Sequence, residues 1–68
     1  MPPRATRRLG MRIKQVREER GMTQADLAAK VGVHSVYLSR IERGVQVPSL
    51  PLLEKLARAL RVEMKQLL

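Results

Sequence analysis

The stretch GVHSVYLSRIERG, residues 32–44, decides the fold, because it sets a short helical pattern between two glycines. Leu38 and Ile41 have the spacing of residues that share one face of a helix. Gly32 is suited to end the preceding helical pattern, since glycine readily adopts the left-handed conformation found at helix ends. The residues between Gly32 and Ser35 leave room only for a tight turn. The sequence therefore predicts two short helices joined at a steep angle, a helix-turn-helix.

The second of these helices has an outward face of unusual composition. Leu38, Ile41 and Glu42 fall on one side of a helical wheel. The other side collects Val36, Ser39, Arg40 and Arg43, flanked by Ser35 and Tyr37. The major groove of DNA admits an α-helix, and there Arg reads guanine, Ser is adaptable and an apolar side chain meets the thymine methyl group. We interpret this face as base-reading; the alternative is a solvated face with one stray valine.

Helical signals continue on both sides of this motif. Apolar residues at i, i+4 and i+7 predict a helix over 9–20, and Thr23 with Asp26 forms a capping box for the next helix. Ser49 is a cap for a further helix, and VEMKQLL, residues 62–68, can add one or two turns. The chain has no cysteine and one aromatic residue, Tyr. These features favour an all-α domain with an aliphatic core.

Charge points to a polyanionic partner. Fourteen Lys and Arg against six acidic residues give a net charge of +8, although a cationic surface can also serve solubility alone. No acid precedes Glu18, so we expect residues 1–8 to form a flexible basic arm before a domain over 9–68. We find no secretory signal and no stretch long enough to span a bilayer, and we expect an intracellular protein.

Two charged residues fall on the inward stripes of different helices. Arg17 follows Ile13 by four positions, and Glu42 follows Ile41. A buried charge without a partner costs several kcal/mol, so we expect an interhelical salt bridge that orients the second helix of the motif. The alternative is that both side chains snorkel to water.

The pattern RIKQVREERGMTQADLAAKVGVHSVYLSRIERGVQVPSLPLLEKLARAL resembles the lambda-repressor and Cro type (XRE-like) of helix-turn-helix proteins. The likeness covers residues 9–68. The resemblance rests on the Thr23-Gln24 opening, the LA..VGV turn and LSRIERG followed by PSL, all in the family's order and spacing. It implies a compact five-helix bundle that regulates transcription by binding operator DNA.

The resemblance also implies contacts to DNA: Ser35 and Val36 would lie at the base-contacting start of the recognition helix, Ser39 and Arg40 further into the groove, and Arg43 would touch the backbone. Gln24 would bond a phosphate, which suits the N–H groups at a helix start, or would be a plain helix-start residue. His34 would cap or fill the turn, or contact a phosphate, and Tyr37 would pack beside the turn or contact DNA. The candidate DNA-binding residues are Thr23, Gln24, His34, Ser35, Val36, Tyr37, Ser39, Arg40 and Arg43.

The C-terminal part departs from the family pattern. Arg61 stands where the family commonly has Gly, and Glu63 where it has a capping Ser, Thr or Pro. Arg61 must therefore adopt the left-handed conformation or let the helix continue. Leu67 and Leu68 are candidates for a dimer interface, or they close the core of a single copy.

The function predicted is a sequence-specific regulator of double-stranded DNA, a repressor that binds a palindromic operator as a homodimer through a recognition helix at about 35–43. We expect it in the cytoplasm of a bacterium or a phage host, with no cofactor, metal, membrane or small-molecule ligand. No catalytic set is evident, and we read the glycines, Gly10 included, as helix punctuation, so we expect no enzyme. The alternative is a small basic helical adaptor that docks acidic proteins.

Overall fold

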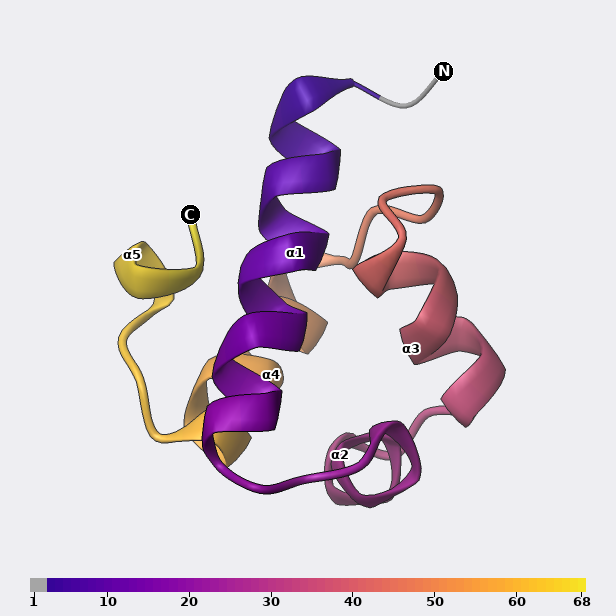
Figure 1. Ribbon diagram of the computed structural model, residues 1–68, viewed down its shortest axis with the longest axis vertical. Coiled ribbons are helices and arrows are strands. Elements are labelled where there is room, and N and C mark those ends of the chain that lie inside the picture. The colour runs from indigo at the N-terminus through magenta and orange to yellow at the C-terminus, as the bar shows by residue number, and fades with distance from the viewer. Residues whose placement is uncertain (1–2) are drawn as a thin grey trace.

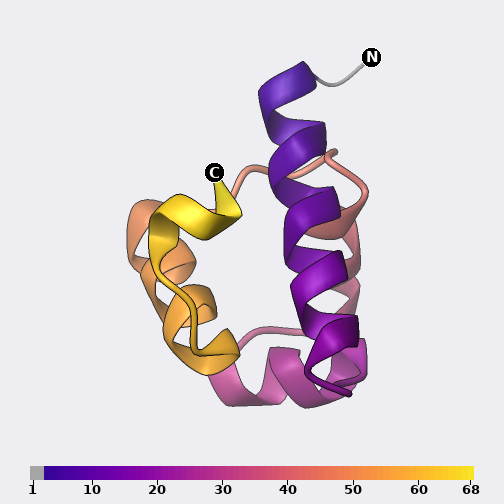
Figure 2. The same cartoon turned by 60° about the vertical axis from the view of Figure 1, so that its left-hand side comes forward.

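The computed structural model describes residues 3–68, and these form five helices with no strand among them. Their bounds are α1 (Arg4–Glu19), α2 (Gln24–Val31), α3 (Ser35–Glu42), α4 (Leu50–Leu60) and α5 (Met64–Leu67). α1 is the longest element, and α2 and α3 lie to its right and α5 to its left in Figure 1. Figure 2 shows α4 and α5 facing α1, with the magenta α2 across the foot of the bundle. The predicted all-α, five-helix architecture is confirmed.

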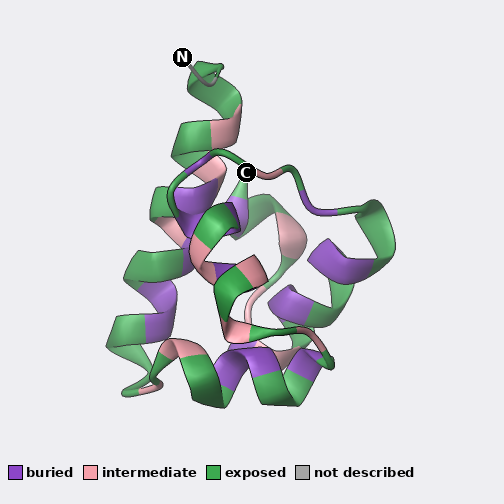
Figure 3. Ribbon diagram, turned by 90° about the vertical axis from the view of Figure 1, so that its right-hand side faces the viewer, coloured by how far each residue is buried: buried purple, intermediate pink, exposed green. Residues whose placement is uncertain are grey.

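One aliphatic core joins all the helices, and buried positions lie on their inward faces (Figure 3). Its fully buried large side chains are Ile13, Leu27, Leu38, Ile41, Leu56, Leu60 and Leu67. Burying one such side chain contributes about 1.5–3 kcal/mol. Leu67 therefore closes the core of the single copy, whereas Leu68 leaves 61% of its surface exposed.

α1 begins five residues earlier than its apolar pattern predicts. The N–H of Arg7 donates to the carbonyl oxygen of Pro3 at 3.1 Å, and Pro3 precedes the first helical residue. Arg and Ala are good helix formers, so the helix extends beyond its apolar stripe. Residues 4–8, expected within a basic arm, thus open α1. The first two residues of that arm lie outside the described residues, and its flexibility stays a prediction.

Gly10 lies inside α1 and does not mark a helix end, so its reading as punctuation is wrong. A Cβ atom at this position would lie 2.2 Å from the carbonyl oxygen of Ile41 and 2.6 Å from that of Glu42. Glycine is needed here because the backbones of α1 and α3 approach too closely for any side chain. This contact sets how α3 lies against α1.

The expected capping box begins α2. The hydroxyl of Thr23 accepts from the N–H of Asp26, and the Asp26 carboxylate accepts from the N–H of Thr23, each at 3.0 Å. The pKa of Asp26 is lowered from its ordinary 3.8, mainly by the hydrogen bond with the Thr23 backbone and next by the one with the Thr23 side chain. The cap therefore favours the ionised carboxylate in the folded state.

Replacing Asp26 with Asn should reduce the loss of unfolding free energy that occurs as the pH falls into the acid range. Because folding lowers this pKa, the carboxylate's contribution is present above the unfolded pKa and is lost as pH falls through the folded one. Urea unfolding at a series of pH values measures the change, and Glu54→Gln controls for losing an exposed negative charge on α4. An acid limb unchanged by Asp26→Asn would contradict the capping role.

Between α4 and α5 the chain follows the first of the two expected alternatives, a left-handed Arg61 rather than a continued helix. Arg61 has φ 58° and ψ 44°, the left-handed conformation that glycine adopts most readily. The N–H groups of Arg61 and Val62 donate to the carbonyls of Arg58 and Ala57, which closes the end of α4. The N–H of Glu63 donates to the side chain of Gln66 at 2.8 Å, so α5 begins without a Ser or Thr cap.

Candidate nucleic-acid interface

α3 separates its faces as the helical wheel predicts. Leu38, Ile41 and Glu42 are buried, whereas Arg40 is exposed. Val36 keeps 61% of its surface exposed. The remaining candidates on this helix are the half-buried Ser35, Tyr37 and Ser39, and the exposed Arg43 follows its last residue. One flank of α3 thus presents hydroxyl, guanidinium and methyl groups to solvent.

The predicted salt bridge between Arg17 and Glu42 fixes α3 from behind. Arg17 donates to both carboxylate oxygens, through Nε at 2.7 Å and a terminal nitrogen at 3.0 Å. Its other terminal nitrogen donates to the carbonyl of Met22 at 2.8 Å. The side chains are 8% and 2% exposed, which excludes the snorkelling alternative. The hydrogen bond to Glu42 raises the pKa of Arg17, which favours the charged guanidinium.

Gln24 joins this buried network from the start of α2. Its side-chain Nε2 donates to Glu42 Oε1 at 2.9 Å. One carboxylate therefore ties α1, α2 and α3 together, a link that the sequence pattern does not reveal. Among residues 3–68, no buried side-chain nitrogen or oxygen lacks a hydrogen-bond partner. The complete pairing favours one arrangement of the two helices of the motif.

The turn between the helices corrects one expectation. His34 is the N-cap residue of α3 and is exposed, but its side chain makes no capping hydrogen bond, so that role is wrong. An imidazole lacks the short side-chain oxygen with which Ser, Thr, Asp or Asn caps a helix. Tyr37 is half-buried and packs on the core, which supports the packing alternative.

Two arginines outside the motif have structural partners that the sequence analysis missed. The Nε of Arg12 donates to the carbonyl of Gln66, and the Nε of Arg20 to that of Leu60, each at 2.8 Å. These bonds tie α1 to the two C-terminal helices. Such partners lie 54 and 40 residues away in sequence, so no local spacing could have indicated them.

Within 3–68, no three His, Cys, Asp or Glu side chains are grouped so that they could hold a metal ion. No helix in this range combines the length and the hydropathy needed to cross a membrane.

Comparison with known proteins agrees with this geometry. The model of a helix-turn-helix family, HTH_3, matches residues 13–67. The chain belongs to this family. The HTH-type transcriptional regulator SinR of Bacillus subtilis is 48% identical over an alignment of 61 residues, and the match covers 88% of this chain and 55% of SinR. The chain thus spans about half the length of that relative.

Solved structures of the family superpose closely on the chain. The restriction-modification controller protein C.AhdI from Aeromonas hydrophila has a TM-score of 0.89 at 33% identity, with 93% of this chain and 96% of that chain covered. SinR in complex with DNA has a TM-score of 0.81 at 47% identity, with 87% and 95% covered. The five-helix bundle is therefore that of helix-turn-helix regulators.

Proposed function

We propose that the protein is a sequence-specific regulator of transcription that places α3 in the major groove of double-stranded DNA. The observation that carries this proposal is the outer flank of α3, where Val36 stays exposed beside Arg40 while Leu38 and Ile41 anchor the opposite side. A valine that keeps most of its surface exposed in the monomer suits a thymine methyl group.

The candidate residues divide into two groups by the part of DNA that we assign to them. The group for base edges is Ser35, Val36, Ser39 and Arg40. The group for the phosphate backbone and the edge of the groove is Thr23, Gln24, His34, Tyr37 and Arg43. Glu42 occupies one donor of the Gln24 amide. A carboxamide has two N–H donors, so the second remains for a phosphate at the N-terminus of α2.

We further propose repression through a palindromic operator bound by a homodimer, in the cytoplasm of a bacterium or a phage host and without catalysis. The names of relatives support regulation, and SinR has been solved with DNA. A single motif covers too little DNA for strong selectivity, whereas two copies related by a two-fold axis place their recognition helices about 34 Å apart, one turn of DNA.

Selection from a random pool of duplex DNA tests this function. We expect an enriched inverted repeat, since a two-fold dimer reads each half-site alike. The logarithm of the binding constant for this repeat should fall linearly with the logarithm of the salt concentration. A pool without enrichment, together with tighter binding to acidic proteins than to DNA, would support the adaptor instead.

Replacing Arg40 with Ala should relax base preference at one operator position by about 1–3 kcal/mol, because an arginine that reads a base edge discriminates against the wrong base. Titration of the selected operator and its single-base variants measures this loss. Arg58→Ala is the matched control, since it removes an exposed arginine from α4. An Arg40→Ala variant that weakens every DNA sequence equally would contradict base reading.

A further inference from the structure

The first turns of α1 lie beside the loop that follows α3 (Figure 1, Figure 2). Arg7 makes this contact, since a Cβ atom at Gly44 would lie 2.8 Å from both the Cα and the Cγ atoms of Arg7. The aliphatic part of Arg7 therefore packs on the backbone of the residue that comes directly after Arg43, the C-cap of α3. Arg7 is nonetheless exposed to solvent. An arginine of α1 thus stands at the C-terminal end of α3.

The C-terminal end of α3 is directed toward the rim of the major groove in the proposed binding mode. The recognition helix of a helix-turn-helix contacts base edges with its N-terminal residues. α3 has 8 residues, so it is about 12 Å long, and the major groove is about 12 Å wide. The end of α3 and the side chains beside it therefore come near the phosphates that border the groove. This step rests on the proposed function.

Arg7 has no acidic partner within the described residues. The ion pairs among residues 3–68 are those of Glu42 with Arg17 and of Glu63 with Lys65. Glu18 is the first acidic residue of the chain and lies 11 positions beyond Arg7, which along a helix is about 17 Å. An exposed guanidinium that no carboxylate neutralises is suited to pair with a phosphate group.

We propose that Arg7 binds a phosphate of the DNA backbone beyond the C-terminal end of α3. This arginine precedes residues 13–67, which match the family model, so its contact is additional to those that the family resemblance implies. Every DNA sequence carries phosphates, and contacts to them fix the position of a protein on the duplex without reading bases. The contact therefore adds affinity and leaves base preference to α3.

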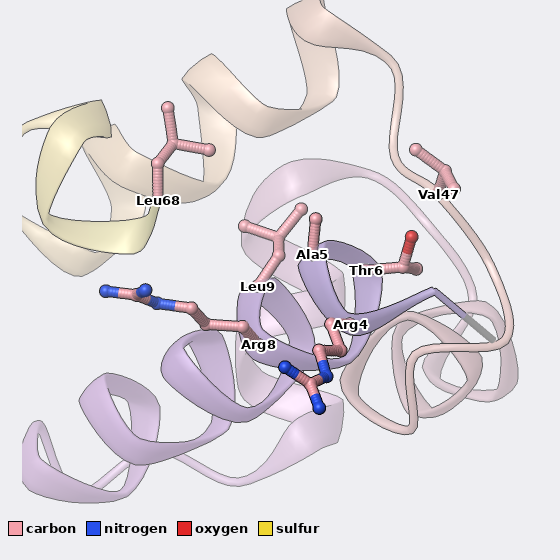
Figure 4. Close-up of a pocket in the computed structure, with 7 residues that line it drawn as sticks. All are labelled: Arg4, Ala5, Thr6, Arg8, Leu9, Val47 and Leu68. Atoms are coloured by element: carbon pink, nitrogen blue, oxygen red, sulfur yellow. The ribbon is translucent and has the colours of Figure 1, made fainter.

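Arg8 provides a matched control at the next position of α1. It is exposed as Arg7 is, but it lines a hollow of about 650 Å³ together with Val47 and Leu68. Figure 4 shows its side chain extending away from Val47, and so away from the loop before α4. Replacing either arginine with Met removes one positive charge and keeps an unbranched, flexible side chain. The packing of position 7 on Gly44 is thereby retained.

The salt dependence of binding tests the proposal with the full chain. The probes are the operator selected from the random pool and a mixed-sequence duplex of the same length, each titrated by fluorescence anisotropy at several salt concentrations. Arg7→Met should weaken binding to both by about two- to fivefold. It should also reduce the slope of log binding constant against log salt by about 0.9, the value for one phosphate.

Two further variants separate a phosphate contact from general attraction of opposite charges. Arg8→Met should leave the slope as it is in the unmodified chain, because a charge that contacts no phosphate is largely screened by salt. Arg7→Lys should also keep that slope, since an ammonium group still neutralises a phosphate as a point charge. Circular dichroism checks that each variant keeps its helices.

Ethylation of single phosphates in the operator locates the contact. Ethylating the phosphate that Arg7 binds should weaken binding of the unmodified chain but not of Arg7→Met. Equal losses of slope in Arg7→Met and Arg8→Met, or a changed base preference in Arg7→Met, would overturn the proposal. If the pool yields no enriched sequence, the proposed function fails, whereas the slopes on the mixed-sequence duplex still decide whether Arg7 binds a phosphate.

Discussion

Glu42→Ala should cost the domain about 3–5 kcal/mol of unfolding free energy, because it leaves the buried Arg17 guanidinium without its partner. The substitution also removes the acceptor of the Gln24 amide. At about 0.05–0.15 kcal/mol per residue, a chain of this length has only about 3–10 kcal/mol of stability in total. The expected loss is therefore a large share of the total unfolding free energy. Urea or thermal unfolding followed by circular dichroism measures it.

A double variant separates loss of the charge pair from loss of packing. Arg17→Met with Glu42→Leu removes both charges and fills the space with apolar atoms, and buried pairs replaced in this way are often neutral or more stable. We expect the double variant to recover most of the lost stability. If Glu42→Ala alone costs less than about 1 kcal/mol, the pair behaves as a surface salt bridge and the proposed anchoring of α3 is wrong.

Gly10→Ala should destabilise the fold by at least about 3 kcal/mol, at the upper end for overpacked sites. The added methyl group would meet the backbone carbonyls of Ile41 and Glu42 at 2.2 and 2.6 Å, and backbone cannot rotate away as a side chain can. The better helix propensity of alanine returns only about 1 kcal/mol. α1 and α3 must move apart, and the midpoint of thermal unfolding should fall accordingly.

Gly21→Ala is the matched glycine substitution, since its Cβ would meet nothing within 4 Å. It should cost only the strain of a left-handed residue, about 1–2 kcal/mol, because φ at Gly21 is +70°. A Gly10→Ala loss no larger than that of Gly21→Ala would show that the contact between α1 and α3 yields easily.

The sequence predicted the parts of this fold that depend on neighbours along the chain. The Thr23 and Asp26 cap and the inward stripe of Leu38 and Ile41 follow from spacings of three or four residues, and the structure has them as expected. The pair of Arg17 and Glu42 was also predictable, because each lies on an apolar stripe where a lone charge is costly.

Other features depend on where distant segments meet and were not predicted. The sequence pattern predicts helix punctuation at Gly10, although an isolated glycine within a helical pattern can also signal close packing. The hydrogen bond from Gln24 to Glu42 was not predicted, because phosphate binding already explains a glutamine at the start of a helix and no second partner is needed. His34 is the N-cap residue of α3 as expected, but its side chain makes no capping bond because an imidazole lacks the short side-chain oxygen of a capping residue.

The single carboxylate that holds the first three helices has a consequence for how specificity can change. Anchoring and the proposed base reading use opposite flanks of the same short helix, so side chains at positions 36, 39 and 40 can be exchanged without disturbing the contacts that fix its angle. A new operator preference could therefore arise by swapping a few surface groups on an unaltered frame.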